Sequence, residues 1–153
     1  AGFSMNDVDP DYVVFGETRA LSYEKIRHAV RLVQNGAKLI GTNPDLTGPD
    51  ESGIVPACRA LISPIEMTTG KNAYFIGKPN PLMMRHALKR LQCSKLETAL
   101  IGDRMDTDII AGIESELDTV LVLSGVSSRE TINQFPYRPK FVLENVGEIV
   151  AEA

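Results

Sequence analysis

The 153-residue sequence predicts an α/β fold built on a parallel β-sheet. The first observation is that short apolar runs with high strand propensity alternate with amphipathic stretches of helical period. The second is that Ser, Pro and Gly residues stand where these helices are expected to begin and end. Strands separated by helices of this length form βα units, in which neighbouring strands run parallel.

In the first half of the chain, the pattern predicts strands at residues 12–15, 37–40 and 73–76, and helices at residues 22–35 and 56–67. Ser22 is expected to cap the first helix and Gly36 to end it. Pro56 is expected to open the second helix, with Pro64 as a kink or an early break. The stretch 42–53 is rich in turn-forming residues and is expected to be a loop.

In the second half, we expect helices at 81–91 and 107–116, a short helix near residue 128, and strands at 98–101, 119–123 and 141–143. Pro81 suits the first turn of its helix. In parallel α/β sheets, ligands bind beyond the carboxyl ends of the strands. That rule selects the four loops that contain Thr42-Asn43, Gly77-Lys78, Gly102-Asp103 and Ser124-Gly125.

The composition argues against several classes of protein. The 20 acidic residues outnumber the 16 basic ones, which is the opposite of the basic footprint of a nucleic-acid-binding protein. No apolar stretch is long enough to span a membrane. The two cysteines, Cys58 and Cys93, have neither metal-site nor redox spacing. We therefore expect a cytoplasmic globular protein with reduced thiols and with no nucleic-acid or membrane partner.

Three carboxylates lie close together where the expected strand 98–101 turns into a helix: Asp103, Asp106 and Asp108. Mg²⁺ prefers oxygen ligands and takes one or two carboxylates from a protein. Asp103 is placed to face a ligand directly, and Asp108 is placed to reach the same site or to brace a neighbour. The competing interpretation is that Asp106 or Thr107 caps the helix and the acidic residues favour the helix dipole.

Lys78, between a glycine and a proline, offers a point charge for phosphate at another strand end. Because Lys78 and Asp103 follow consecutive strands joined by one helix, we expect them to lie side by side. An acidic metal ligand beside a phosphate-facing lysine is an arrangement for phosphoryl transfer. The loop that holds Asn43, Asp45 and Thr47 could contact a substrate, although an ordinary turn explains it equally well.

Gly77-Lys78-Pro79, followed by Gly102-Asp103-x-x-x-Thr107-Asp108, resembles the third and fourth motifs of haloacid dehalogenase (HAD) phosphatases. Further segments resemble the NagD-like branch of this superfamily, namely residues 10–19, 41–45, 55–58 and 121–128. The resemblance implies Mg²⁺-dependent hydrolysis of small phosphomonoesters, such as nucleotide or sugar phosphates, through a phosphoaspartate. The fold it implies is part of a HAD-type Rossmann-like parallel sheet with part of a large α/β cap domain.

The resemblance also implies a role for each candidate residue. Lys78 would neutralise the charge of phosphate and nucleophile, Asp103 would bind Mg²⁺, and Asp108 would brace the lysine and the metal shell. Residues 1–72 would be the C-terminal part of the cap domain and residues 73–153 the C-terminal half of the core domain. Asn43, Asp45 and Thr47 in the cap would face the substrate, a small phosphorylated metabolite.

One departure from the family pattern is large, because no Asp-x-Asp followed by Gly-Thr ends a strand in this sequence. Asp7-Val8-Asp9 has the spacing but precedes a strand. We therefore expect this chain alone to lack the nucleophile, to be inactive, and to expose a sheet edge that favours homo-oligomerisation. The alternatives are a non-catalytic α/β binding or interaction module, or a receiver-like protein in which Asp103 itself accepts the phosphoryl group.

Overall fold

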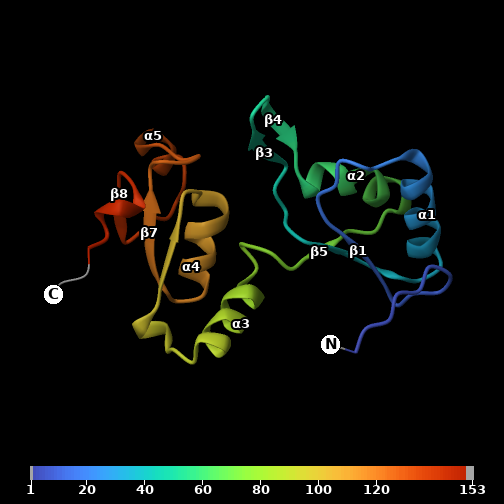
Figure 1. The fold of residues 1–153 in the computed structure, drawn as a ribbon, viewed down its shortest axis with the longest axis horizontal. Helices are drawn as coiled ribbons and strands as arrows, with labels where there is room; N and C mark the ends of the chain where they lie inside the picture. Colours follow the sequence, from blue (N-terminus) through green and yellow to red (C-terminus); the bar gives the residue numbers. More distant parts are fainter. Residues whose placement is uncertain (1, 151–153) are drawn as a thin grey trace. The chain divides into compact units, whose positions relative to one another are not determined.

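The computed structural model describes residues 2–150 and consists of two compact units, Ala1–Gly77 and Lys78–Ala153 (Figure 1). The boundary between them lies a few residues after residue 72, where the sequence analysis divides the chain. The cap and core roles of the two units stay predictions. No helix within residues 2–150 is long and apolar enough to cross a membrane.

The first unit contains a three-stranded parallel sheet of order β1-β2-β5 and a separate antiparallel hairpin, β3-β4. The strands are β1 (Tyr12–Phe15), β2 (Lys38–Gly41), β3 (Thr47–Asp50), β4 (Gly53–Pro56) and β5 (Tyr74–Phe75), and the helices are α1 (Tyr23–Gln34) and α2 (Cys58–Thr69). Ser22 caps α1 by accepting a hydrogen bond from the Lys25 N–H at 3.3 Å, as predicted. The described strands of this sheet lie within two residues of their predicted bounds.

Both helices of the first unit pack on one face of its sheet (Figure 1). The buried core consists of Val33 from α1, Leu39 from β2, and Ile62 and Ile65 from α2. Alternate residues of a strand point to opposite faces, so β1 directs Val13 and Phe15 to this core and exposes its other two residues. Burial of this single cluster holds the two helices against the sheet.

Two predictions about the first unit are wrong in detail. The stretch expected to be a loop contains the β3-β4 hairpin, in which Thr47 pairs with Pro56, so Pro56 ends a strand and α2 begins at Cys58. A two-stranded ribbon tolerates proline because each strand has a free edge. Pro64 does not break α2, which continues to Thr69, because the Ser63 hydroxyl donates to the Ala60 carbonyl at 2.7 Å and replaces the N–H that proline lacks. The alternative expectation, a kink at Pro64, stays a prediction.

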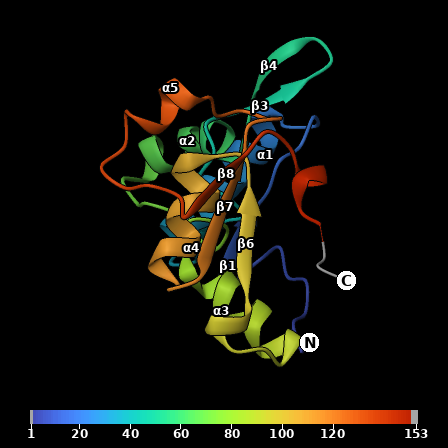
Figure 2. The same cartoon turned by 90° about the vertical axis from the view of Figure 1, so that its left-hand side faces the viewer.

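The second unit has its own parallel sheet, of order β6-β7-β8, with the three strands side by side (Figure 2). Its strands are β6 (Ala99–Gly102), β7 (Asp118–Val122) and β8 (Phe141–Leu143), and its helices are α3 (Pro81–Leu91), α4 (Ile110–Glu114) and α5 (Arg129–Ile132), with short 3₁₀ turns at Lys95–Glu97 and Val146–Glu148. Pro81 opens α3 as predicted, and the Asn80 side chain caps it. Together the two units give the α/β fold with parallel strands that the sequence predicts.

The helix predicted at 107–116 begins earlier and changes type along its length. Met105–Ile109 form one π-helical turn, and α4 continues from it. Met105 and Ile109 are buried with Leu121 of β7 in one core cluster, while Met84 of α3 lies in a second one. Because Met105 and Ile109 are buried, the turn attaches the end of β6 firmly to the core. Single π turns inside helices occur frequently at functional sites.

Candidate active site

Asp108 is a buried carboxylate, and each of its two oxygens interacts with a neighbouring group. Only 3% of the residue is exposed, and its Oδ2 accepts a hydrogen bond from the Arg104 N–H at 3.1 Å. The carboxylate lies so close to Gly102 that a Cβ at that position would stand 2.3 Å from the Asp108 Cγ. Glycine at the end of β6 is therefore required by the position of Asp108, and not by an unusual backbone angle.

Lys78 forms an ion pair with Oδ1 of this same carboxylate. The strands before Lys78 and Asp103 belong to different sheets, since β5 pairs with β2 whereas β6 pairs with β7, and the expectation that the two residues lie side by side stays a prediction. The contact that the structure provides is with Asp108, and the Lys78 side chain stays 42% exposed. Its ammonium group is thus fixed at one point and retains further donors for a ligand.

Asp103 follows β6 directly and is half-buried. Its Oδ2 accepts a hydrogen bond from the Val126 N–H at 2.9 Å, while its Oδ1 accepts none from any residue that the structure describes. A carboxylate with one oxygen held and one free suits a hard cation. Asp103 therefore fits Mg²⁺ as one ligand among several oxygens.

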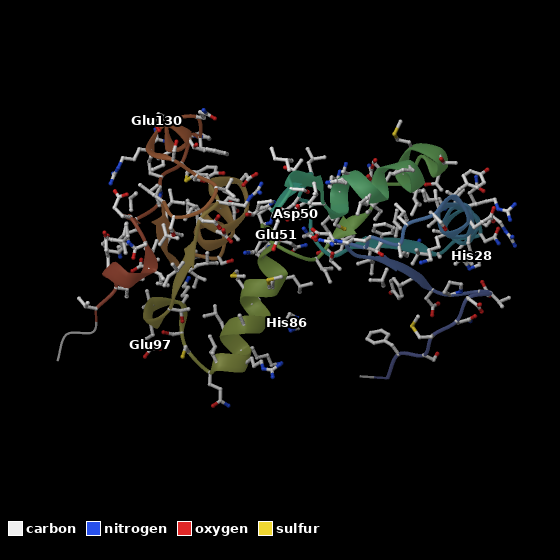
Figure 3. All side chains as sticks on the ribbon, turned by 45° about the horizontal axis from the view of Figure 1, so that its top comes forward. His28, Asp50, Glu51, His86, Glu97 and Glu130 are labelled. Carbon is white, nitrogen blue, oxygen red and sulfur yellow. The ribbon has the colours of Figure 1, made fainter. Side chains whose placement is uncertain are left out.

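Asp103 would need further oxygen ligands to complete a metal shell. Within residues 2–150, no group of three or more His, Cys, Asp or Glu side chains could hold a metal ion. His28 in α1 and His86 in α3 are both exposed (Figure 3). Mg²⁺ usually keeps several waters and takes only one or two carboxylates from the protein, so the Asp103 oxygen is a suitable partial site.

The residues that hold the turn after Asp103 were not predicted from the sequence. The Met105 N–H donates to the Ser127 Oγ at 3.2 Å, and the Tyr137 hydroxyl donates to the Met105 carbonyl at 3.0 Å. Burial and the negative charge of Asp106 raise the pKa of Tyr137, which keeps its hydroxyl protonated and able to donate. The strand-end rule did select the Ser124-Gly125 loop, but no local pattern identifies Ser127.

Asp106, the third carboxylate of the motif, faces outward and not toward Asp103. Its two oxygens accept from Nε and Nη2 of Arg104 at 3.0 and 2.8 Å. Such a fork-shaped pair fixes both side chains, and the Asp106 side chain is 49% exposed. Asp106 is thus a solvent-facing residue, and the interpretation in which Asp106 or Thr107 caps the helix is wrong, because the turn begins after Arg104 without a side-chain cap.

The three residues expected to face the substrate belong to the first unit, and the structure brings only two of them together. Nδ2 of Asn43 donates to Oδ2 of Asp45 at 2.6 Å and to Glu17 at 3.4 Å. Thr47 lies in β3, where it pairs with Pro56 and is exposed. Glu17, which the sequence analysis did not select, is therefore part of the Asn43 network, and Thr47 has no contact with that network in the hydrogen bonds of the described residues.

An open pocket of about 640 Å³ lies on the first unit between the loop after β1 and the β3-β4 hairpin. Its charged lining residues are Glu17, Arg19 and Asp50, the last beside the hairpin turn (Figure 3). Arg19 pairs with Asp50 at 3.4 Å, and hydrogen bonds from Ser52 lower the pKa of Asp50. The lining is net negative, which disfavours a phosphate group there.

Comparison with known proteins supports a single family. A model of HAD-hydrolase-like proteins matches residues 75–149. The chain is 46% identical to the dihydroxyacetone phosphatase of Corynebacterium glutamicum, covering 97% of this chain and 54% of that protein. It is 44% identical to the ribonucleotide monophosphatase NagD of Escherichia coli, covering 97% of this chain and 58% of that protein.

The structure of NagD from E. coli superposes on 97% of the chain with a TM-score of 0.88 and 43% sequence identity, and this match covers 58% of the NagD chain. The chain thus spans a little more than half the length of these relatives. High identity over nearly all of this chain, together with the same fold, confirms the resemblance found in its motifs. The chain belongs to the HAD superfamily and, within it, to the NagD-like branch.

Proposed function

We propose that the protein containing this chain is a Mg²⁺-dependent phosphatase of small phosphomonoesters. The observation that carries the proposal is the group at the end of β6, where Asp103 presents a free carboxylate oxygen and Asp108 holds the ammonium group of Lys78. This group stands at the carboxyl end of a parallel strand, where α/β proteins bind ligands. The relatives of this chain include two proteins named as phosphatases.

Lys78 is proposed to bind the phosphoryl group. A lysine ammonium has three donors and no acceptor, and the ion pair with Asp108 uses one direction while the side chain stays half-exposed. Asp108, with both oxygens engaged, is proposed to hold the lysine in place and not to act as a metal ligand. Asp108 is given this role because both of its carboxylate oxygens are engaged, whereas Asp103 keeps one oxygen free.

Asp103 is proposed to be the protein's ligand to Mg²⁺ in this chain. When bound, the ion would neutralise negative charge on the transferring phosphoryl group. Asp103 supplies one oxygen and keeps the other on the Val126 N–H, so its carboxylate plane stays fixed. The phosphoaspartate route of HAD phosphatases also needs an attacking aspartate, and therefore the proposal concerns the whole protein.

The substrate class proposed is small sugar phosphates and nucleoside monophosphates. The support is that two relatives are named for dihydroxyacetone phosphate and ribonucleotide substrates. The linked side chains of Asn43, Asp45 and Glu17 are proposed to contact the leaving group, because they supply hydrogen-bonding groups on a strand-end loop. The free thiols of Cys58 and Cys93 fit a cytoplasmic location.

The test is phosphate release by the whole protein from dihydroxyacetone phosphate, a ribonucleoside monophosphate and p-nitrophenyl phosphate, with Mg²⁺ and with EDTA. Three variants are compared: Asp103→Asn, Lys78→Met and, as a matched control, Lys89→Met on the exposed side of α3. We expect kcat/KM for the first two to fall about 100-fold or more, by analogy with the loss of one preorganised charge-stabilising group. The control should stay within about twofold of the parent, as expected for an exposed surface position.

Two outcomes would overturn the proposal. One is that no ester releases phosphate faster with Mg²⁺ than with EDTA. The other is that Lys78→Met behaves like Lys89→Met, which would leave the non-catalytic binding module as the better interpretation. Phosphate found covalently on Asp103 would instead favour the receiver-like alternative.

A further inference from the structure

The loop between β7 and α5 donates hydrogen bonds to both the side chain and the backbone carbonyl of Asp103. Its Val126 N–H donates to Oδ2 of Asp103 at 2.9 Å, and its Ser127 N–H donates to the Asp103 carbonyl at 3.0 Å. The Ser127 hydroxyl in turn accepts from the Met105 N–H at 3.2 Å. These three hydrogen bonds fix the Asp103 side chain, its own carbonyl and the peptide two residues later.

Gly125 completes this arrangement by its lack of a side chain. A Cβ at this position would stand 2.1 Å from Oδ2 and 2.5 Å from Cβ of Asp103. Contacts this short are not tolerated between such atoms, so the carboxylate would have to move. The close approach of the loop backbone is therefore what allows the Val126 N–H to reach the carboxylate.

We infer that Ser127 is a positioning residue that orients the Asp103 carboxylate toward the cation. The inference rests on the proposed function, since it assumes that Asp103 binds Mg²⁺. Ser127 itself touches neither cation nor substrate. It acts through the backbone, because its hydroxyl and its N–H together join the loop after β7 to the turn after β6.

Burial makes Ser127 suited to this role. The residue is 4% exposed, and Met105, to which it is bonded, is 1% exposed. Water therefore has little access to replace the hydroxyl as acceptor for the Met105 N–H, and removal of the hydroxyl leaves that N–H without a partner. The backbone around Asp103 would then relax, and the Val126 N–H would lose its alignment with Oδ2.

The neighbouring Ser128 provides a matched control. Its hydroxyl accepts from the Thr131 N–H at 3.3 Å and donates to Glu130 at 2.7 Å, and both partners belong to α5. Ser128 is exposed and, in the hydrogen bonds of the described residues, it does not contact the Asp103 turn. The two adjacent serines thus have the same chemistry but different partners.

The experiment measures Mg²⁺ binding to the whole protein by titration calorimetry without substrate, together with its thermal unfolding. The variants are Ser127→Ala, Ser128→Ala and Gly125→Ala, the last of which displaces the carboxylate directly and does not depend on the hydroxyl. Loss of a group that orients a metal ligand weakens metal binding about tenfold or more. We expect that loss for Ser127→Ala and Gly125→Ala, and a change within about twofold for Ser128→Ala, as expected for an exposed cap away from the metal ligand.

The inference is overturned if Ser127→Ala lowers the unfolding temperature while its Mg²⁺ affinity stays with that of Ser128→Ala. Such a result would make Ser127 a structural residue only. If the parent protein hydrolyses phosphomonoesters in this case, the proposed function stands and only the positioning role falls. A parent protein that binds no Mg²⁺ would remove both.

Discussion

Glu66 in the first unit and Asp108 in the second are the two acidic residues that lie buried among those the structure describes, with 8% and 3% exposed. Each accepts one hydrogen bond from a backbone N–H and one from a basic side chain. Glu66 accepts from Ala73 at 2.7 Å and from Arg59 at 3.2 Å. Asp108 accepts from Arg104 at 3.1 Å and pairs with a lysine. Local chemistry alone does not distinguish the two.

Their positions along the strands differ. The N–H that Glu66 accepts belongs to Ala73, immediately before β5, whereas the N–H that Asp108 accepts belongs to Arg104, shortly after β6. Ligands of parallel sheets bind at the carboxyl ends of strands, so only Asp108 lies at an end where a ligand is expected. We infer that Glu66 fastens α2 to its sheet, and under the proposed function Asp108 holds the ammonium group of Lys78.

The basic side chains that pair with Glu66 and Asp108 differ as well. Arg59 also stacks on the Phe75 ring at 5.1 Å from its centroid, so its charge is used within the unit. Lys78 has a single ion-pair partner in the described residues, and its side chain is half-exposed. A buried carboxylate therefore indicates function here only when its partner retains donors for a ligand.

The largest expected effect is that of Gly102→Ala, which forces the new methyl group against the Asp108 carboxylate. We expect the free energy of unfolding to fall by about 3 kcal/mol, at the upper end for overpacking of a filled site. Urea denaturation measures this loss. Phosphatase activity should fall with it, because displacement of Asp108 also displaces Lys78.

Gly48→Ala in β3 of the first unit is the matched control. Nothing lies within 4 Å of a Cβ at this position, so stability should change by no more than about 0.5 kcal/mol. Equal losses for the two glycines would mean that glycine removal costs the same anywhere. The steric account of the Asp108 site would then be wrong.

Much of the fold was predictable because its signals are local. Ser22 and Pro81 mark helix starts by their own chemistry, and the short apolar run of β1, rich in β-branched and aromatic residues, marks a strand. The β3-β4 hairpin was missed because its strands carry Gly and Pro, which favour turns. The early break expected as one outcome at Pro64 does not occur, because a single hydroxyl, that of Ser63, compensates for the missing N–H.

The candidate site was predictable only in part. Lys78, Asp103 and Asp108 stand in motifs at strand ends, so residue type and place selected them. Ser127 and Glu17 act through contacts to residues far away in the sequence, which no local pattern encodes. Glu66 did carry a signal, since it continues the buried face of α2 one turn after Ile62, but a carboxylate on an apolar face identifies a buried charge and not its purpose.

The second-largest effect is expected for Glu66→Leu, which tests whether Glu66 has a structural role. The Ala73 N–H loses its acceptor and Arg59 loses its ion pair, so we expect a loss of about 2 kcal/mol in unfolding free energy. Glu66→Gln keeps an oxygen for the Ala73 N–H and should lose less than half as much. The kcat/KM of the whole protein should stay unchanged in both, and a clear fall in well-folded protein would place Glu66 in the functional site.

The smallest effect is expected for Arg59→Met. The Arg59 side chain is 38% exposed, so water screens its ion pair with Glu66, and its contact with Phe75 adds a modest cation–π term. We expect a loss of about 1 kcal/mol, with activity retained, whereas Lys78→Met should lower kcat/KM about 100-fold or more. Arg27→Met on exposed α1 is the control, since its pair with Glu24 at 2.8 Å is a surface pair three residues apart, worth a few tenths of a kcal/mol. If Arg59→Met reduced activity as strongly as Lys78→Met, the basic partners would be equivalent. The position of each pair along its strand would then not decide which of them is functional.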